Sequence, residues 1–179
     1  MGIIFRETKL KGSFIVEPEK FEDERGFFGR SFSDREFEAQ GINPRIVECN
    51  ISFNKKKHTI RGMHFQSAPY AQAKLVRCTQ GAIYDVIIDL RPESPTYKEW
   101  VAEELTATNR LMLYVPEGFA HGFQTLEDDT EVLYQMSAHY APAAAGGVRW
   151  NDPVFAIRWP PAADVIVNER DGTYPDYPR

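Results

Sequence analysis

Two histidines lie in glycine-rich segments flanked by aromatic residues, and together they could bring general-base chemistry to one cavity. His64 lies near the end of residues 58–66, and His121 follows the turn at residues 116–118. A neutral imidazole accepts and returns protons near pH 7, so either residue could act as a general acid or base. A single histidine more often has a structural role, and the residues alone leave both interpretations open.

The same two segments resemble the metal-binding motifs of cupins, with one gap. Residues 116–121 match the second cupin motif, Pro-x-Gly-x-x-His. The first motif would read His-x-His with a glutamate soon after, but this chain has His64-Phe65-Gln66 and no acid before Asp85. A catalytic metal needs three protein ligands and an open position, so two histidines and an amide make a poor site. We therefore expect a cupin that uses neither a metal nor another cofactor.

A metal-free cavity with a histidine can still transfer protons at a carbon next to a carbonyl group. This reaction needs a base, a group that orients it, a cation or donor for the enolate oxygen, and an acid. Lys74 lies in a strand-like segment, either as a buried cation or as a solvated edge residue. Tyr134 shares a strand face with apolar residues, where a tyrosine is more often core than catalyst. Asp171 lies in a polar tail that nothing local distinguishes.

Period-two alternation predicts the elements that must position these residues. Turn-forming residues separate the expected strands, which cover residues 14–16, 46–53, 59–66, 74–79, 83–90, 111–115, 122–126, 131–138 and 154–157. One helix is expected over residues 34–40, with Ser33 as its cap, Glu36 completing a capping box and Gly41 at its end. Strands and helices do not alternate, so the chain is expected to be all-β, with residues 1–179 forming one cupin-type jelly-roll barrel with short peripheral helices.

Strand parity also predicts which side chains share a face. In residues 83–90, Asp85 and Asp89 lie on one face with two isoleucines. In residues 58–66, His64 and Gln66 lie on one face, and Arg61 lies on the other.

Composition narrows the class of protein. The 179 residues carry a formal net charge of −5 without a basic face, which argues against a nucleic-acid binder. No apolar run approaches a membrane span, and the first residues do not resemble a secretory signal, so we expect a cytoplasmic protein. Cys49 and Cys78 lack metal-binding or redox spacing and are expected to be buried thiols.

Motifs along nearly the whole chain, from about residue 21 to residue 174, resemble the dTDP-4-dehydrorhamnose 3,5-epimerases, a family of metal-free cupins that form dimers. The matching motifs are residues 23–28 (Asp-Glu-Arg-Gly-Phe-Phe), 61–66 (Arg-Gly-Met-His-Phe-Gln), 74–77, 85–91, 94–96, 116–123, 150–153, 157–160 and the tail ending in Asp171. Their order and spacing make the resemblance specific, although most of them are weak alone.

The resemblance implies a catalytic role for six residues. His64 would remove the proton next to the C4 keto group of a nucleotide-linked sugar, and Asp171 would pair with His64. Lys74 would stabilise the C4 enolate. Tyr134 would deliver a proton to the opposite face, and His121 and Asp85 would line the same pocket.

The resemblance also implies the residues that bind the nucleotide-diphosphate sugar. Arg25 and Arg61 would hold the diphosphate, with Arg25 reaching the site of the partner subunit in a homodimer, and Phe28 and Tyr140 would wall the nucleotide pocket. The wider set of binding residues also includes Arg30, Glu48, Asn50, Gln66 and Arg170.

Departures from the family pattern concentrate near the expected nucleobase. Arg30 stands where the family usually has glutamate, Glu48 replaces a glutamine, and residues 143–145 are three alanines where an acid is usual. An arginine in place of an acid exchanges an acceptor for a donor. The alternatives are therefore an epimerase acting at C3 or C5 only, or on a GDP- or CDP-linked sugar. A further alternative, outside the epimerases, is a cupin that depends on a metal or one that only binds sugars.

Overall fold

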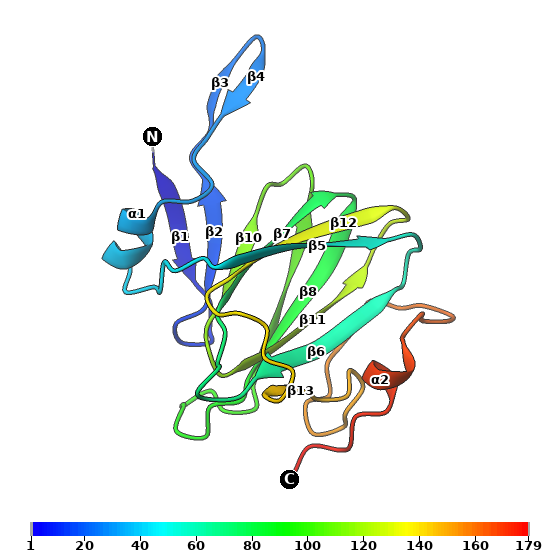
Figure 1. The fold of residues 1–179 in the computed structure, drawn as a ribbon. Coiled ribbons are helices and arrows are strands. Elements are labelled where there is room, and N and C mark those ends of the chain that lie inside the picture. Colours follow the sequence, from blue (N-terminus) through cyan, green and yellow to red (C-terminus); the bar gives the residue numbers. More distant parts are fainter. Residues whose placement is uncertain (1, 179) are drawn as a thin grey trace.

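The computed structural model describes residues 2–178, and two antiparallel sheets that face each other make up most of it (Figure 1). The first sheet has the strand order β1-β2-β10-β7-β12-β5, with β1 at Ile3–Glu7, β2 at Phe14–Pro18, β10 at Met112–Val115, β7 at Lys74–Gln80, β12 at Thr130–Met136 and β5 at Glu48–Asn54. The second has the order β13-β6-β11-β8-β9, with β13 at Ala145–Gly147, β6 at Ile60–Gln66, β11 at Phe119–Thr125, β8 at Ala82–Asp89 and β9 at Trp100–Thr106.

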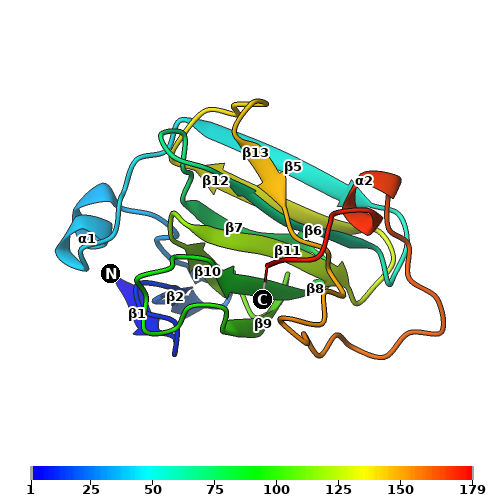
Figure 2. The ribbon, with the colours of Figure 1, turned by 90° about the horizontal axis from the view of Figure 1, so that it is seen from below.

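Three smaller elements lie at the edges of this sandwich. The hairpin of β3 (Phe21–Asp23) and β4 (Gly26–Phe28) projects away from the two sheets (Figure 1). The short helices α1 (Asp34–Ala39) and α2 (Glu169–Gly172) lie at opposite ends of the molecule, with α2 beside β6 (Figure 2). The expected all-β jelly roll with short peripheral helices is confirmed. No helix in residues 2–178 is long and apolar enough to cross a membrane.

The alternating residues of β8 place apolar side chains in a core cluster on each of its two faces. Ile83 and Ile87 pack between the sheets against residues of β7 and β10 such as Val76 and Leu113. Val86 and Ile88 point the other way, into a second apolar cluster covered by the C-terminal segment. Burial of an aliphatic side chain contributes about 1.5–3 kcal/mol, so this strand anchors both layers and fixes the register of its polar residues.

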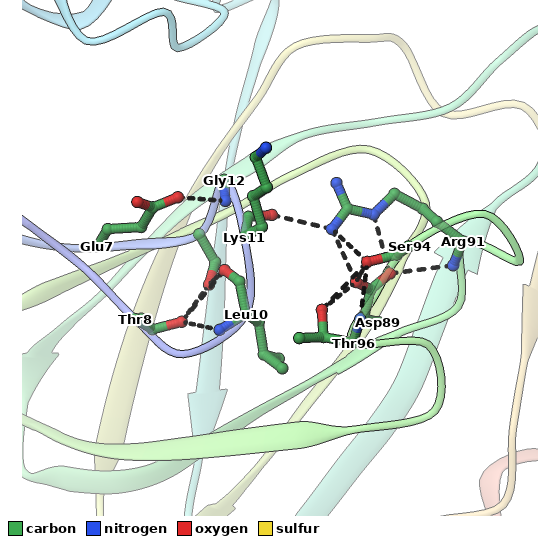
Figure 3. Close-up of polar contacts among 10 residues, drawn as sticks. Glu7, Thr8, Leu10, Lys11, Gly12, Asp89, Arg91, Ser94 and Thr96 are labelled. Atoms are coloured by element: carbon green, nitrogen blue, oxygen red, sulfur yellow. Dashed lines mark hydrogen bonds and ion pairs between the residues drawn. The ribbon is translucent and has the colours of Figure 1, made fainter.

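The carboxylate of Asp89 organises the connection from β8 to β9 (Figure 3). It is fully buried and accepts hydrogen bonds from Arg91 Nε at 2.9 Å and Nη2 at 2.7 Å, and from the hydroxyls of Ser94 and Thr96. Burial disfavours the charged carboxylate, but these hydrogen bonds outweigh it and lower the pKa of Asp89 to about 2. Arg91 also donates to the Lys11 carbonyl at 2.9 Å, which ties the turn between β1 and β2 to this loop.

A bulge in β6 makes the parity prediction for residues 58–66 wrong. His64 is opposite His121 and Arg61 is opposite Phe123, so β6 uses three steps where β11 uses two. Gly62 lies at this irregularity with φ +129, and a Cβ there would come within 2.5 Å of the backbone of β11. The extra residue turns Arg61 to the same side as His64, because one inserted residue reverses the alternation.

Other local expectations fail where tertiary contacts compete with the local pattern. Residues 154–157 form a turn and irregular backbone instead of a strand, because the Asp152 carboxylate accepts the Val154 amide at 2.8 Å. In α1, Ser33 makes no side-chain cap, and Glu36 accepts from the Ile3 amide at 2.7 Å instead of completing a capping box. Cys78 is buried as expected.

The expectation that Cys49 is a buried thiol is also wrong. Its side chain is exposed, on edge strand β5. The prediction failed because the sequence does not reveal which strand lies at the edge of a sheet.

Candidate active site

A cavity of about 490 Å³ opens between the two sheets. β5, β7 and β12 line it from one sheet and β6 and β11 from the other. The structure brings together at this cavity most of the residues selected from the sequence: Glu48, Asn50, Arg61, His64, Gln66, Lys74, His121, Tyr134, Tyr140 and Arg170. Asp85 and Asp171 lie directly behind the two histidines.

His64 and Asp171 form a hydrogen-bonded pair at the cavity wall. His64 Nε2 lies 2.7 Å from Asp171 Oδ1, and the second carboxylate oxygen accepts the Gly62 amide at 3.0 Å. Asn168 caps α2 by accepting the Asp171 amide, which fixes the carboxylate behind the imidazole. Burial alone would raise the pKa of Asp171, but the hydrogen bonds from His64 and Gly62 lower it. The His64 side chain remains 41% exposed, so its ring is accessible to a ligand.

His121 and Asp85 form a second pair that is almost completely enclosed. Their Nε2 and Oδ1 atoms are 2.7 Å apart, and the side chains are 4% and 0% exposed. Burial lowers the pKa of His121 despite the neighbouring carboxylate, so its imidazole is neutral near pH 7. Asp85 Oδ2 has no hydrogen-bond partner within residues 2–178. The pair therefore adds a buried negative charge beside the cavity.

Lys74 and Tyr134 face the histidines from the other sheet. Burial lowers the pKa of Lys74 to about 8, while the charge of Asp85 acts in the opposite direction. Lys74 therefore still carries its proton at pH 7. Burial, together with the charge of Asp85, raises the pKa of Tyr134, so its phenol keeps its proton at neutral pH. The Tyr134 ring packs edge-on against His121 with centroids 5.9 Å apart.

These placements put an imidazole and a phenol on opposite walls. His64 belongs to β6 in the five-stranded sheet, whereas Lys74 and Tyr134 belong to β7 and β12 in the six-stranded sheet. A flat substrate between the sheets would have the imidazole on one face and the phenol on the other. This arrangement can remove a proton from one face of a carbon and return one to the other.

Cationic groups line the mouth of the cavity. Arg61 Nε donates to Asn54 Oδ1 at 2.7 Å, which holds the guanidinium in place. Hydrogen bonds to Tyr140 and Tyr174 raise the pKa of Arg170, which lies on α2. Guanidinium groups match phosphate oxygens in geometry and charge, so this mouth can bind a diphosphate.

Two predicted binding residues line the cavity but bind the protein's own backbone. Glu48 accepts the Tyr140 amide at 3.3 Å and pairs with His139 Nδ1 at 2.9 Å. Gln66 bonds three backbone groups around the same segment. Three residues that the sequence did not single out hold groups around the cavity: Asn54 accepts from Arg61, Gln72 donates to the Ala138 carbonyl, and His139 pairs with Glu48. No local pattern marks them, because their partners are distant in the chain.

Three predicted binding residues lie outside this cavity. Arg25 is at the tip of the projecting hairpin and pairs with Asp23, and Phe28 is 68% exposed on the same hairpin. Arg30 forms an ion pair with Glu36 of α1. Within a single chain these residues do not contribute to the site, so any role there requires a second copy.

The side chains that the structure describes around the two histidines do not form a metal site. Within residues 2–178, no three histidine, cysteine, aspartate or glutamate side chains converge in a way that could hold a metal ion. Gln66 stands where the first cupin motif has its second histidine, and its side-chain amide bonds the backbone. The expectation that the protein needs no metal or other cofactor stays a prediction.

Comparison with known proteins identifies the family. Residues 7–178 match the family model for dTDP-4-dehydrorhamnose 3,5-epimerase. The protein of that name from Sinorhizobium fredii is 42% identical over 171 residues, which cover 96% of this chain and 88% of the relative. The dTDP-4-dehydrorhamnose 3,5-epimerase from Bacillus anthracis, solved with TDP and PPi bound, has a TM-score of 0.93 and 42% identity, covering 98% of this chain and 100% of that one.

A solved relative with a narrower activity is also similar. ChmJ from Streptomyces bikiniensis, a 3'-monoepimerase solved in complex with dTDP-quinovose, has a TM-score of 0.87 and 30% identity, covering 94% of this chain and 85% of that one. The family-model match and the identities of about 40% over nearly the whole chain confirm the resemblance seen in the sequence motifs. This chain belongs to the dTDP-4-dehydrorhamnose 3,5-epimerase family.

Proposed function

We propose that this protein is an isomerase that inverts C3 and C5 of a dTDP-linked 4-keto-6-deoxysugar. The observation that carries the proposal is the placement of His64, backed by Asp171, on the wall opposite Tyr134 and Lys74. The names of the curated relatives and the thymidine nucleotide bound to the Bacillus anthracis relative support this substrate.

The first step is proton abstraction by His64. If His64 Nε2 carries the hydrogen that binds Asp171, the Nδ1 lone pair is free to accept the proton from the carbon next to the C4 keto group. The C–H electron pair moves to the keto oxygen and forms an enolate, and the Asp171 carboxylate stabilises the resulting imidazolium. Lys74 supplies a partly buried cation for the enolate oxygen, where an ammonium is worth more than in water.

The second step is protonation from the opposite face. The enolate collapses back to the ketone, and the same carbon takes the proton of the Tyr134 phenol, which inverts the centre. His64 then returns its proton to solvent and Tyr134 regains one, so that the cycle can repeat at the other carbon. His121 and Asp85 support this proton network from the buried side.

The nucleotide diphosphate would lie at the mouth, with Arg61 and Arg170 on its phosphates and Tyr140 against the base. Asn50 lines the same part of the cavity.

A homodimer would complete the site with Arg25 and Phe28 from the partner's hairpin. The hairpin is poor in contacts with its own chain and exposes Phe21, Phe27 and Phe28 at 50%, 44% and 68%. Edge strand β5 exposes Ile51 and Phe53 at 64% and 47%. Such apolar exposure favours an interface. Light scattering after gel filtration tests this, and a monomer at micromolar concentration would contradict it.

Proton NMR in heavy water tests the activity. With dTDP-4-keto-6-deoxyglucose as substrate, we expect deuterium to enter at both C3 and C5. Incorporation at one carbon only would establish a single-site epimerase, the second candidate, which the similarity to the 3'-monoepimerase ChmJ favours.

The same assay separates the nucleotide alternatives. No incorporation with the dTDP sugar, but incorporation with a GDP- or CDP-linked keto sugar, would assign a different base. The absence of exchange with all three would contradict the epimerase and leave a metal-dependent or sugar-binding cupin. That residues 1–179 form one domain and that the protein is cytoplasmic also stay proposals, which limited proteolysis and cell fractionation test.

A further inference from the structure

The segment that joins β12 to β13 carries Tyr140, which lines the cavity. Side chains from other parts of the chain hold its backbone at successive positions. Gln72 Nε2 donates to the Ala138 carbonyl at 2.6 Å, and Glu48 Oε2 accepts the Tyr140 amide at 3.3 Å. The Tyr140 side chain is itself 57% exposed, so packing does little to hold its ring. Its position depends on these backbone contacts and on the hydrogen bond between its side chain and Arg170.

Gln66 holds this segment on both sides of Tyr140. Its Oε1 accepts the Ala141 amide at 2.8 Å, and its Nε2 donates to the His139 carbonyl at 3.2 Å and to the Tyr70 carbonyl at 2.8 Å. The side chain is 7% exposed. Both Nε2 hydrogens are therefore used within the protein, and none is left for a substrate.

Only a carboxamide satisfies these three backbone groups together. A glutamate at this position would keep the acceptor for Ala141 but would set a negative charge against two carbonyl oxygens. An apolar side chain of similar size would satisfy none of them, and buried unpaired polar groups are costly. Gln66 is the last residue of β6 and lies two residues after His64, so it connects the strand of the base to the segment that carries Tyr140.

We propose that Gln66 is a positioning residue that fixes Tyr140 at the nucleotide end of the cavity and thereby sets the affinity for the nucleotide diphosphate. It does not take part in proton transfer. This inference rests on the proposed function, in which Tyr140 forms a wall of the nucleotide site.

A double-mutant cycle on dTDP binding tests the inference. We expect Q66E to weaken binding of dTDP about tenfold by titration calorimetry and to raise the KM for the dTDP-linked keto sugar by a similar factor, a larger change than any in kcat. Tyr140→Ala should weaken binding by a similar factor, because stacking of an aromatic ring on a base is lost. Q66E combined with Tyr140→Ala should bind no more weakly than Tyr140→Ala alone, because Gln66 acts through Tyr140.

Gln80→Glu is the matched control. Gln80 Nε2 also donates to a loop carbonyl, that of Asp129 at 2.8 Å, at the end of β7 remote from the cavity. This variant should bind dTDP like the wild type. Unchanged affinity in folded Q66E, or additive losses in the double variant, would overturn the inference.

A second variant and a measurement on the wild type cover the case in which Q66E does not fold. Gln66→Met keeps the volume without the charge and should show the same loss of affinity. In the wild type, the Ala141 amide should exchange with heavy water at least tenfold more slowly than the Ala143 amide, and equal rates would overturn the inference. If the wild type does not bind dTDP, the proposed nucleotide is wrong. The exchange rates of the Ala141 and Ala143 amides need no nucleotide, so they still test whether Gln66 holds the segment that carries Tyr140.

Discussion

Replacing Lys74 with methionine should lower activity and raise stability at once. Burial lowers the pKa of Lys74 from 10.5 to about 8. At 1.36 kcal/mol for each pKa unit, the folded protein loses about 3 kcal/mol by holding this ammonium in the cavity wall. That cost is already net of the attraction between Lys74 and Asp85. Methionine removes it, so we expect a gain on the order of 3 kcal/mol in the free energy of unfolding at pH 7.

The stability gain should depend on pH in a defined direction. Below pH 8 the lysine is charged in both the folded and the unfolded chain, and the full cost is present. As the pH rises from about 8 toward 10.5, the folded protein releases the proton first, and the cost disappears. Urea unfolding of wild type and K74M at pH 7 and pH 10 measures this difference, with Lys55→Met, an exposed turn residue, as the control.

Activity should change in the opposite sense. Removing a donor to a developing oxyanion costs about 10²–10³ in kcat, so K74M should lose activity by at least that factor in the solvent-exchange assay. In the wild type, kcat/KM should decline with an apparent pKa near 8 on the basic side, because Lys74 must be charged. Burial raises the pKa of Cys78 to about 11 and that of Tyr134 as well, so neither explains a decline there. A basic limb above pH 10, or a K74M variant with wild-type activity, would refute the reasoning.

Three further predictions concern the other proton-carrying groups. His64→Ala should abolish exchange of the substrate protons with heavy water, followed by NMR, and substantial remaining exchange would remove His64 as the base. Tyr134→Phe should keep exchange but slow inversion, and equal loss of both would contradict its role as the acid. Asp89→Asn should reduce the free energy of unfolding by about 2 kcal/mol at pH 7, since the folded pKa of about 2 lies below the ordinary 3.8. That difference should be fully present above pH 4 and disappear as the pH falls through 2, and a difference independent of pH would show that the charge is not its source.

The fold class could be predicted from the local pattern of residues, and so could most of the side chains that line the cavity. The alternation in residues 83–90 predicted a strand, and β8 covers Ala82–Asp89 with apolar side chains buried on both of its faces. The segments around His64 and His121 lie opposite each other as neighbouring strands, as two cupin-like motifs imply. Residue types that can transfer a proton, such as histidine and tyrosine, are visible in the sequence itself, because this ability belongs to the individual side chain. The specific motifs then pointed to a family that the comparisons confirm.

How these residues converge depends on contacts between distant parts of the chain. The bulge at Gly62 brings Arg61 to the side of His64, although parity separates them, and bulges depend on the partner strand. Asp171 reaches His64 across 107 residues, from a tail without a local signal. Glu36, Cys49 and residues 154–157 were mispredicted for a related reason, since the distant contacts and the order of strands in the sheet are absent from a local pattern. Periodicity reports the average environment of a segment, whereas the position of a functional group depends on individual long-range hydrogen bonds that only the folded chain forms.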